Sequence, residues 1–184
     1  EPMVSELNLG KRCIILCDPN VFHVGNKVKD LLEKFFVEVK NPGPIEVESV
    51  KRFDEEFKKF DFAMAIGGGK TTDVTKYASF LAKKPWISFP TILSHDGIVS
   101  SRASLDSNGA RISIDASEPA AIIADLDIIK NAPYRWLAAG AGDLIANISA
   151  VEDWKLATRS GKEKYHTLIA ELSLLSAKAV IEHT

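Results

Sequence analysis

Short, mostly apolar segments that are typical of strands alternate with helix-like segments over the first 90 residues of the chain. The strand-like segments occupy residues 12–17, 37–39, 62–66 and 86–89. Between them, apolar residues recur at the spacing of a helix face, at Val28, Leu31, Leu32, Phe35 and Phe36, at Val47, Val50, Phe53 and Phe57, and at Val74, Tyr77, Ala78 and Leu81. Uninterrupted apolar strands are typical of parallel sheets that are buried on both faces. The sequence therefore predicts an α/β fold with a Rossmann-like parallel sheet and flanking helices.

The pattern changes in the second half of the chain. Two short runs, 101–105 and 110–114, flank Asp106-Ser107-Asn108-Gly109, which favours the tight turn of a β-hairpin. One more strand is expected at 121–124, and the residues from Pro133 onward predict two helices that are broken near Ser160-Gly161. We therefore expect an α/β domain over residues 1–128 and the beginning of an all-α domain, incomplete here, over residues 129–184.

Composition and charge exclude several classes of protein. Apolar residues make up 46% of the chain and charged residues 26%, and the net charge of −2 comes without a cluster of lysines and arginines, which argues against disorder and against a nucleic-acid partner. No apolar stretch approaches the ~18 residues of a transmembrane helix, and no signal peptide is recognisable, so we expect no membrane insertion. Cys13 and Cys17 are too far apart along one strand for a disulfide, and we expect two reduced, buried thiols in a cytoplasmic protein. The start at Glu1 and the helical pattern that runs to Thr184 lead us to expect truncation at both ends.

A triple glycine stands at the end of the third predicted strand. Gly67-Gly68-Gly69 joins that strand to a helix that Thr71 or Thr72 can cap. Glycines allow a ligand to approach the backbone closely, and the free N–H groups of the following helix attract anions. A diphosphate is the expected ligand, and the alternative is a tight turn that binds nothing. The glycine spacing differs from the Walker sequence and from Gly-x-Gly-x-x-Gly, which argues against a P-loop nucleotidase and against the commonest dinucleotide fingerprint.

Polar residues also follow the fourth predicted strand, where α/β sheets place their ligands. The segment is Pro90-Thr91-Ile92-Leu93-Ser94-His95-Asp96-Gly97. The hydroxyls of Thr91 and Ser94 are candidates to bond a second part of the same ligand, and Asp96 is a candidate to bind substrate hydroxyls. The structural alternatives are an Asx-type turn at Asp96 and a purely structural role for His95.

Small residues precede an acidic residue in the predicted helical part. Ala139-Gly140-Ala141-Gly142 allows close packing and leaves space beside Asp143, which we expect near the start of a helix. Asn147 lies one turn further along the same face, so the pair could coordinate a metal and orient a ligand. The alternative is that Asp143 only complements the positive end of a helix dipole.

Taken together, these segments resemble one enzyme superfamily. The motifs are Gly67-Gly68-Gly69-Lys70-x-x-Asp73, Pro90-Thr91-x-x-Ser94-His95-Asp96-Gly97-x-x-Ser100 and Gly142-Asp143-Leu144-Ile145-x-Asn147. Their order and spacing resemble those of dehydroquinate synthases, glycerol dehydrogenases and iron-containing alcohol dehydrogenases. The Ser-His-Asp-Gly element is more selective, and with Arg102-Ala103-Ser104-Leu105 and Ala121-Ile122-Ile123-Ala124-Asp125 after it, it resembles the sn-glycerol-1-phosphate dehydrogenases.

The resemblance implies a role for each candidate site residue. The diphosphate of NAD(P)H would be held by Gly68, Gly69, Lys70, Thr71, Thr72 and Asp73, and the rest of the cofactor would be contacted by Thr91, Ser94 and Ser100. Asp96 and Asp143 would be catalytic and would bind substrate, and Asp143 would also ligate Zn²⁺. The two histidines that complete the zinc site in the family belong to a later segment that these 184 residues lack. A single carboxylate holds zinc poorly, because zinc takes about four donors.

The implied reaction is the reduction of dihydroxyacetone phosphate to sn-glycerol 1-phosphate, a step in the phospholipid metabolism of archaeal-type ether lipids. Zinc would polarise the ketone oxygen, and the nicotinamide would supply the hydride. Two alternatives stay open: a glycerol dehydrogenase that acts on unphosphorylated glycerol, and a catalytically incomplete nucleotide-binding fragment. The sequence does not specify NADH or NADPH, since Asp18 and Asp54 are candidate ribose ligands by position only. It is compatible with a homo-oligomer and does not specify the oligomeric state.

Overall fold

A computed structural model describes residues 1–183 of the chain. It divides into two compact units, one formed by residues 1–92 and 97–132, the other by residues 93–96 and 133–183. Within residues 1–183, every helix is too short or too polar to cross a lipid bilayer.

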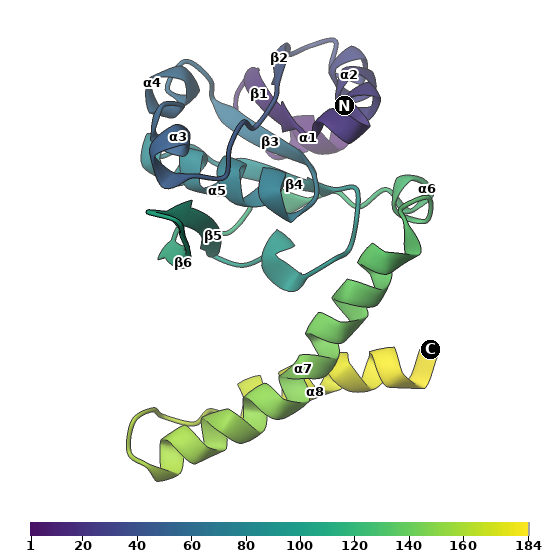
Figure 1. The fold of residues 1–184 in the computed structure, drawn as a ribbon. Helices are drawn as coiled ribbons and strands as arrows, with labels where there is room; N and C mark the ends of the chain where they lie inside the picture. The colour runs from purple at the N-terminus through teal and green to yellow at the C-terminus, as the bar shows by residue number, and fades with distance from the viewer. Residues whose placement is uncertain (184) are drawn as a thin grey trace. The chain divides into compact units, whose positions relative to one another are not determined.

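The first unit is built on a parallel sheet of five strands in the order β2-β1-β3-β4-β7 (Figure 1). The strands are β1 (Arg12–Cys17), β2 (Phe36–Lys40), β3 (Phe62–Gly67), β4 (Trp86–Pro90) and β7 (Ala121–Ile122). The three inner strands β1, β3 and β4 are buried over nearly their whole length, which explains why their residues are mostly apolar. The predicted parallel sheet is confirmed, although β7 is shorter than the run at 121–124 suggested.

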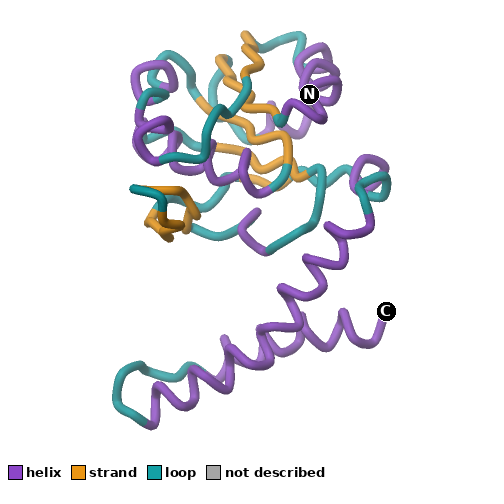
Figure 2. Tube along the Cα trace, in the orientation of Figure 1, coloured by secondary structure: helices purple, strands orange, loops and turns teal. Residues whose placement is uncertain are grey.

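Helices cover both faces of this sheet (Figure 2). They are α1 (Pro2–Glu6) and α2 (Phe22–Leu31) on one face, and α3 (Val47–Lys51), α4 (Asp54–Phe57) and α5 (Gly69–Ala82) on the other. Side chains alternate along each strand, so Ile15 of β1 packs in the cluster that contains Val24 of α2, whereas Leu16 packs in the cluster that contains Val74 of α5. Two short 3-10 helices, η1 (Pro19–Val21) and η2 (Asp96–Ile98), follow β1 and β4.

The remaining elements also follow the predicted order. β5 (Arg102–Ser107) and β6 (Ala110–Asp115) form the antiparallel hairpin, with positive φ at both Asn108 and Gly109, as a two-residue turn of this kind requires. A short helix α6 (Leu126–Ile129) ends the first unit. The second unit contains α7 (Tyr134–Arg159) and α8 (Thr167–His183), which pack against each other, so the predicted break near Ser160-Gly161 is confirmed.

The predicted extent of two helical segments is wrong. α2 ends at Leu31, Leu32 already leaves helical geometry, and Phe36 begins β2. Phe35 instead packs edge-on against Phe62 of β3, so its apolar character serves the sheet and not a helix face. The segment that was expected to be one helix with Val47 and Phe57 on its apolar face is two short helices, α3 and α4, and both pack against the same core cluster.

Candidate functional site

The carboxyl ends of β1 and β3 form the switch point of the sheet. From β1 the chain passes to β2 on one side, and it then crosses to β3 on the other side. Ligands of open α/β sheets bind outside the carboxyl ends of the strands at such a point. The Asp18 N–H, after β1, donates to the Ile66 carbonyl at 2.9 Å, and the Thr91 N–H, after β4, donates to the Gly67 carbonyl at 3.1 Å. Three strand ends therefore meet at one edge, with the glycine turn between them.

Close contacts require the glycines of this turn. Gly67 has a φ of +156°, and a Cβ on it would lie 2.8 Å from Thr71 Oγ1 and 2.9 Å from Asp18 Cβ. A Cβ on Gly68 would lie 2.6 Å from Ile92 Cδ1. The turn thus packs against the chain that follows β1 and against the chain that follows β4.

The first turn of α5 is not capped by any side chain. Gly68 is the N-cap residue, and the Thr72 N–H donates to the Gly68 carbonyl at 3.0 Å. The prediction that Thr71 or Thr72 caps the helix is wrong, because Gly69 already adopts helical geometry and both threonines lie inside the helix.

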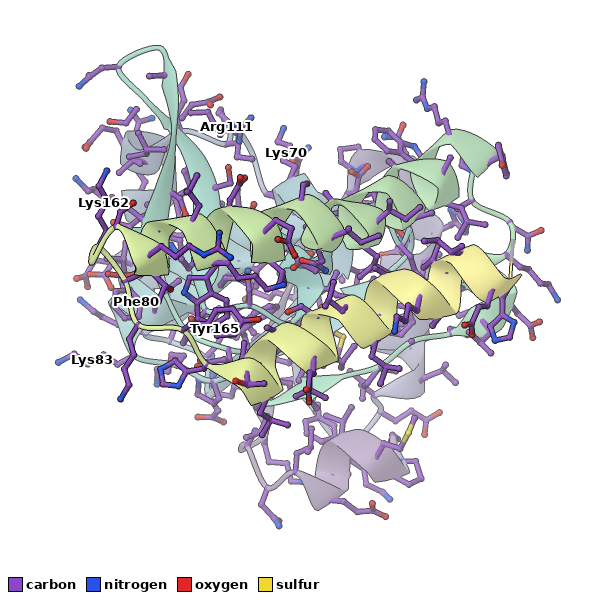
Figure 3. The ribbon with its side chains drawn as sticks, turned by 90° about the horizontal axis from the view of Figure 1, so that it is seen from below. Lys70, Phe80, Lys83, Arg111, Lys162 and Tyr165 are labelled. Atoms are coloured by element: carbon purple, nitrogen blue, oxygen red, sulfur yellow. The ribbon has the colours of Figure 1, made fainter. Side chains whose placement is uncertain are left out.

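Several hydrogen-bond donors at the N-terminus of α5 have no partner among residues 1–183. Within residues 1–183, the backbone N–H groups of Gly69, Lys70 and Thr71 have no acceptor. The buried Thr71 hydroxyl is likewise unpartnered in the part of the chain that the structure describes. Free N–H groups at the positive end of a 14-residue helix suit an anion, and the exposed Lys70 adds a positive charge in the same turn (Figure 3).

Lys76, a buried lysine that the sequence analysis did not single out, bonds the segment that follows β4 to helix α5. The Lys76 side chain has no exposed surface, and its Nζ donates to the carbonyls of Gly97 and Arg102, each at 2.7 Å. Nζ also lies 3.3 Å from Ser100 Oγ and 3.5 Å from Asp73 Oδ1. The signal in the sequence was a lysine three residues after Asp73 in a helix otherwise rich in small and apolar residues. The network brings Ser100 and Asp73, two of the predicted cofactor residues, to the same side of α5.

The two predicted catalytic carboxylates come together within the second unit. The Asp96 N–H donates to Asp143 Oδ2 at 2.9 Å, across 47 residues of sequence. Gly140 allows this approach, since a Cβ on it would lie 2.1 Å from the Leu93 carbonyl oxygen. The expectation that Asp143 stands at a helix start is wrong: α7 begins at Tyr134 and continues through the glycines. Asp143 is therefore not an N-terminal charge of its own helix; it accepts instead from the first N–H of the 3-10 helix η2. Ser94 and His95 lie half-buried in the same 93–96 segment.

The described residues do not complete a metal site. Among residues 1–183, no three His, Cys, Asp or Glu side chains gather closely enough to hold a metal ion. Asp143 supplies one carboxylate, whereas zinc takes about four donors.

Comparisons with known proteins place this arrangement in a family. The iron-containing alcohol dehydrogenase family matches residues 1–133. The glycerol-1-phosphate dehydrogenase of Thermococcus sibiricus is 44% identical over 98% of this chain and 53% of its own length, and that of Pyrococcus horikoshii is 44% identical over 97% and 53%. The chain spans about half the length of the curated relatives it matches.

Solved structures show the same fold. Glycerol dehydrogenase from Schizosaccharomyces pombe superposes with a TM-score of 0.66 at 28% identity, over 74% of this chain and 37% of that one. An iron-containing alcohol dehydrogenase from Thermotoga maritima superposes with a TM-score of 0.67 at 17% identity, over 95% of this chain and 61% of that one.

Proposed function

Because the chain belongs to the iron-containing alcohol dehydrogenase family, we propose that it is the cofactor-binding half of an NAD(P)-dependent glycerol-1-phosphate dehydrogenase. The observation that carries the proposal is the uncapped N-terminus of α5 at the switch point of the sheet. The names of the relatives support the substrate, which is dihydroxyacetone phosphate in the reducing direction and sn-glycerol 1-phosphate in the other.

The residues of the first unit fit a dinucleotide. The free N–H groups of Gly69, Lys70 and Thr71 would donate to the diphosphate, and Gly68 would let it approach the backbone. Thr72 and Asp73 are almost fully buried, so they would support the turn from inside, and Thr91 would fix Gly67 through its backbone N–H. When bound, the nicotinamide supplies the hydride.

The substrate is proposed to meet the second unit. The Asp96 N–H fixes Oδ2 of Asp143, and Oδ1 of Asp143 has no partner among residues 1–183 and could accept a substrate hydroxyl. Ser94 lies two residues before Asp96 and would contact the cofactor. Zinc dependence and a role in ether-lipid synthesis are further parts of this proposal, and the sequence resemblance supports both. A cytoplasmic location is also proposed, and the free, buried cysteines support it.

A glycerol dehydrogenase is the second candidate, favoured by the similarity to the enzyme from Schizosaccharomyces pombe. The two are separated by assaying the full-length protein with dihydroxyacetone phosphate and with dihydroxyacetone, with each cofactor. A site built for the phosphate should favour dihydroxyacetone phosphate by a factor on the order of 100 or more in kcat/KM. Preference for dihydroxyacetone would select the second candidate, and activity with neither would remove both.

The proposed cofactor site is tested with a variant whose own side-chain carboxylate accepts from the free N–H groups of α5. Asp is a strong N-cap residue, so Gly68→Asp should place a carboxylate on these donors and should stabilise α5 by about 1 kcal/mol relative to Gly68→Ala. The same carboxylate should weaken the binding of ADP-ribose, a diphosphate probe, by about tenfold or more, because it competes with and repels the diphosphate. Affinity is measured by titration calorimetry and stability by urea unfolding.

Gly68→Ala is the matched control. Both variants add a Cβ close to Ile92, so their difference isolates the carboxylate from the steric effect. Equal affinity of the two variants for ADP-ribose, with the expected gain in stability for Gly68→Asp, would mean that the helix end binds no diphosphate.

A further inference from the structure

We infer that Lys76 is a positioning residue that holds residues 97–102 on the cofactor helix α5, and that it thereby controls affinity for the nicotinamide half of NAD(P)H. This inference rests on the proposed function. Lys76 itself is fully buried, so it acts on the ligand through the segment that it holds.

The hydrogen bonds of Lys76 show what the side chain fixes. An ammonium has three N–H donors, and burying it is costly unless these donors are satisfied. The two shortest bonds of Nζ go to the carbonyls of Gly97 and Arg102, at the two ends of one short segment. Ser100 lies between these ends, with its Oγ 3.3 Å from Nζ and 3.2 Å from the Arg102 carbonyl that it donates to. One charge therefore determines the path of this segment.

The place of the segment in the sheet order identifies the half of the cofactor that it serves. In dinucleotide-binding folds the ribose of the adenosine half is read near the end of the second strand. Here β2 is the edge strand on one side of the switch point, whereas residues 97–102 follow β4 on the other side. A ligand with its diphosphate at the N-terminus of α5 would direct its nicotinamide half toward the β4 side.

The same helix also fixes the neighbouring chain. Ile92 packs beside Gly68 at the N-cap of α5, and Gly97 is bonded to Lys76 two turns further along the helix. Ile92 and Gly97 are therefore both held against α5 within the first unit.

The test compares two probes on the full-length protein: NADPH, and ADP-ribose, which has the diphosphate and lacks the nicotinamide. Lys76→Met keeps an unbranched apolar side chain, one atom shorter than lysine, and removes the N–H donors. We expect the Kd for NADPH to rise about tenfold or more and the Kd for ADP-ribose to change less than about twofold. Lys76→Gln keeps two N–H donors and should restore part of the NADPH affinity. Lys27→Met, on the exposed side of α2, is the control that should change neither Kd.

The outcomes separate the inference from the function that it rests on. A wild-type protein that binds neither probe would overturn the proposed function. Wild-type binding combined with equal weakening of both probes in Lys76→Met, or with no weakening of either, would overturn the role of Lys76 alone. If Lys76→Met does not fold, Lys76→Gln carries the same comparison, and failure of both to fold would show general structural support and would also overturn the inference.

Discussion

Cys13 and Cys17 illustrate how burial sets the chemistry of a side chain. Both thiols are free and have no exposed surface in β1, so the prediction of two buried, unpaired cysteines is confirmed. Burial raises the pKa of both thiols, that of Cys17 to about 11. The Cys17 Sγ also lies 3.5 Å from the Val21 carbonyl, within reach of a weak S–H hydrogen bond.

The raised pKa of Cys17 predicts a loss of stability at alkaline pH. Thiols of the unfolded chain ionise from a pKa of about 8.5 upward, whereas folded Cys17 keeps its proton to a pKa of about 11. The contribution is therefore complete below pH ~8.5 and is lost as the pH rises toward 11. Between pH 7.5 and pH 10, the urea concentration at the unfolding midpoint should fall more for the wild type than for Cys17→Ala. Each midpoint is measured on a single cooperative unfolding transition. An equal fall in both would show that other groups cause it.

At the scale of the element, α7 contains two glycines that serve different purposes. Gly140 lies against the backbone of Leu93, in the contact that brings Asp96 to Asp143. Gly142, two residues later, has no atom within 4 Å of an added Cβ. The first glycine is required by packing between segments, and the second is not.

Alanine substitutions should therefore have opposite effects at these two positions. Gly140→Ala should destabilise the protein by about 1–3 kcal/mol, because backbone at 2.1 Å cannot easily yield. Gly142→Ala should stabilise it by about 0.5–1 kcal/mol, since alanine is the better helix former. Urea unfolding of the two variants measures both effects. A gain in stability from Gly140→Ala would mean that the 93–96 segment does not pack on α7 in solution.

At the scale of the whole molecule, metal binding distinguishes this chain from the longer protein proposed to contain it. The resemblance implies that Asp143 is one zinc ligand of three, and residues 1–183 contain no cluster of three ligand side chains. A metal held by one carboxylate and water exchanges readily, whereas a catalytic site with three protein ligands holds zinc firmly.

We therefore expect the 184-residue chain to carry no stoichiometric zinc and to show no chelator-sensitive activity. The full-length protein should carry about one zinc ion per chain and lose activity on chelation, and Asp143→Ala should abolish both there. Elemental analysis of the two proteins side by side is the measurement. Tight zinc in the short chain would point to unrecognised ligands, with His95 and His166 the first to examine. Zinc retained by full-length Asp143→Ala would remove Asp143 from the site.

Local pattern was sufficient for the sheet, the hairpin and the position of the glycine turn. An uninterrupted apolar run such as 62–66 indicates a strand that is buried on both faces of the sheet. Asn108-Gly109 indicates a turn that needs positive φ at both residues. These properties depend on a few neighbouring residues, so they can be read from the sequence without knowing the rest of the fold.

Tertiary structure alone decided where apolar side chains pack and which polar groups meet. Phe35 has helical spacing in the sequence, yet it packs on Phe62 because β2 begins beside it. Lys76 is buried and hydrogen-bonded only because residues 97–102 return to α5. Asp96 contacts Asp143 only because the 93–96 segment packs on α7. Spacing along the chain reports which side of an element is apolar, whereas contacts across 20 to 50 residues follow from how the elements are connected and packed, which no local pattern contains.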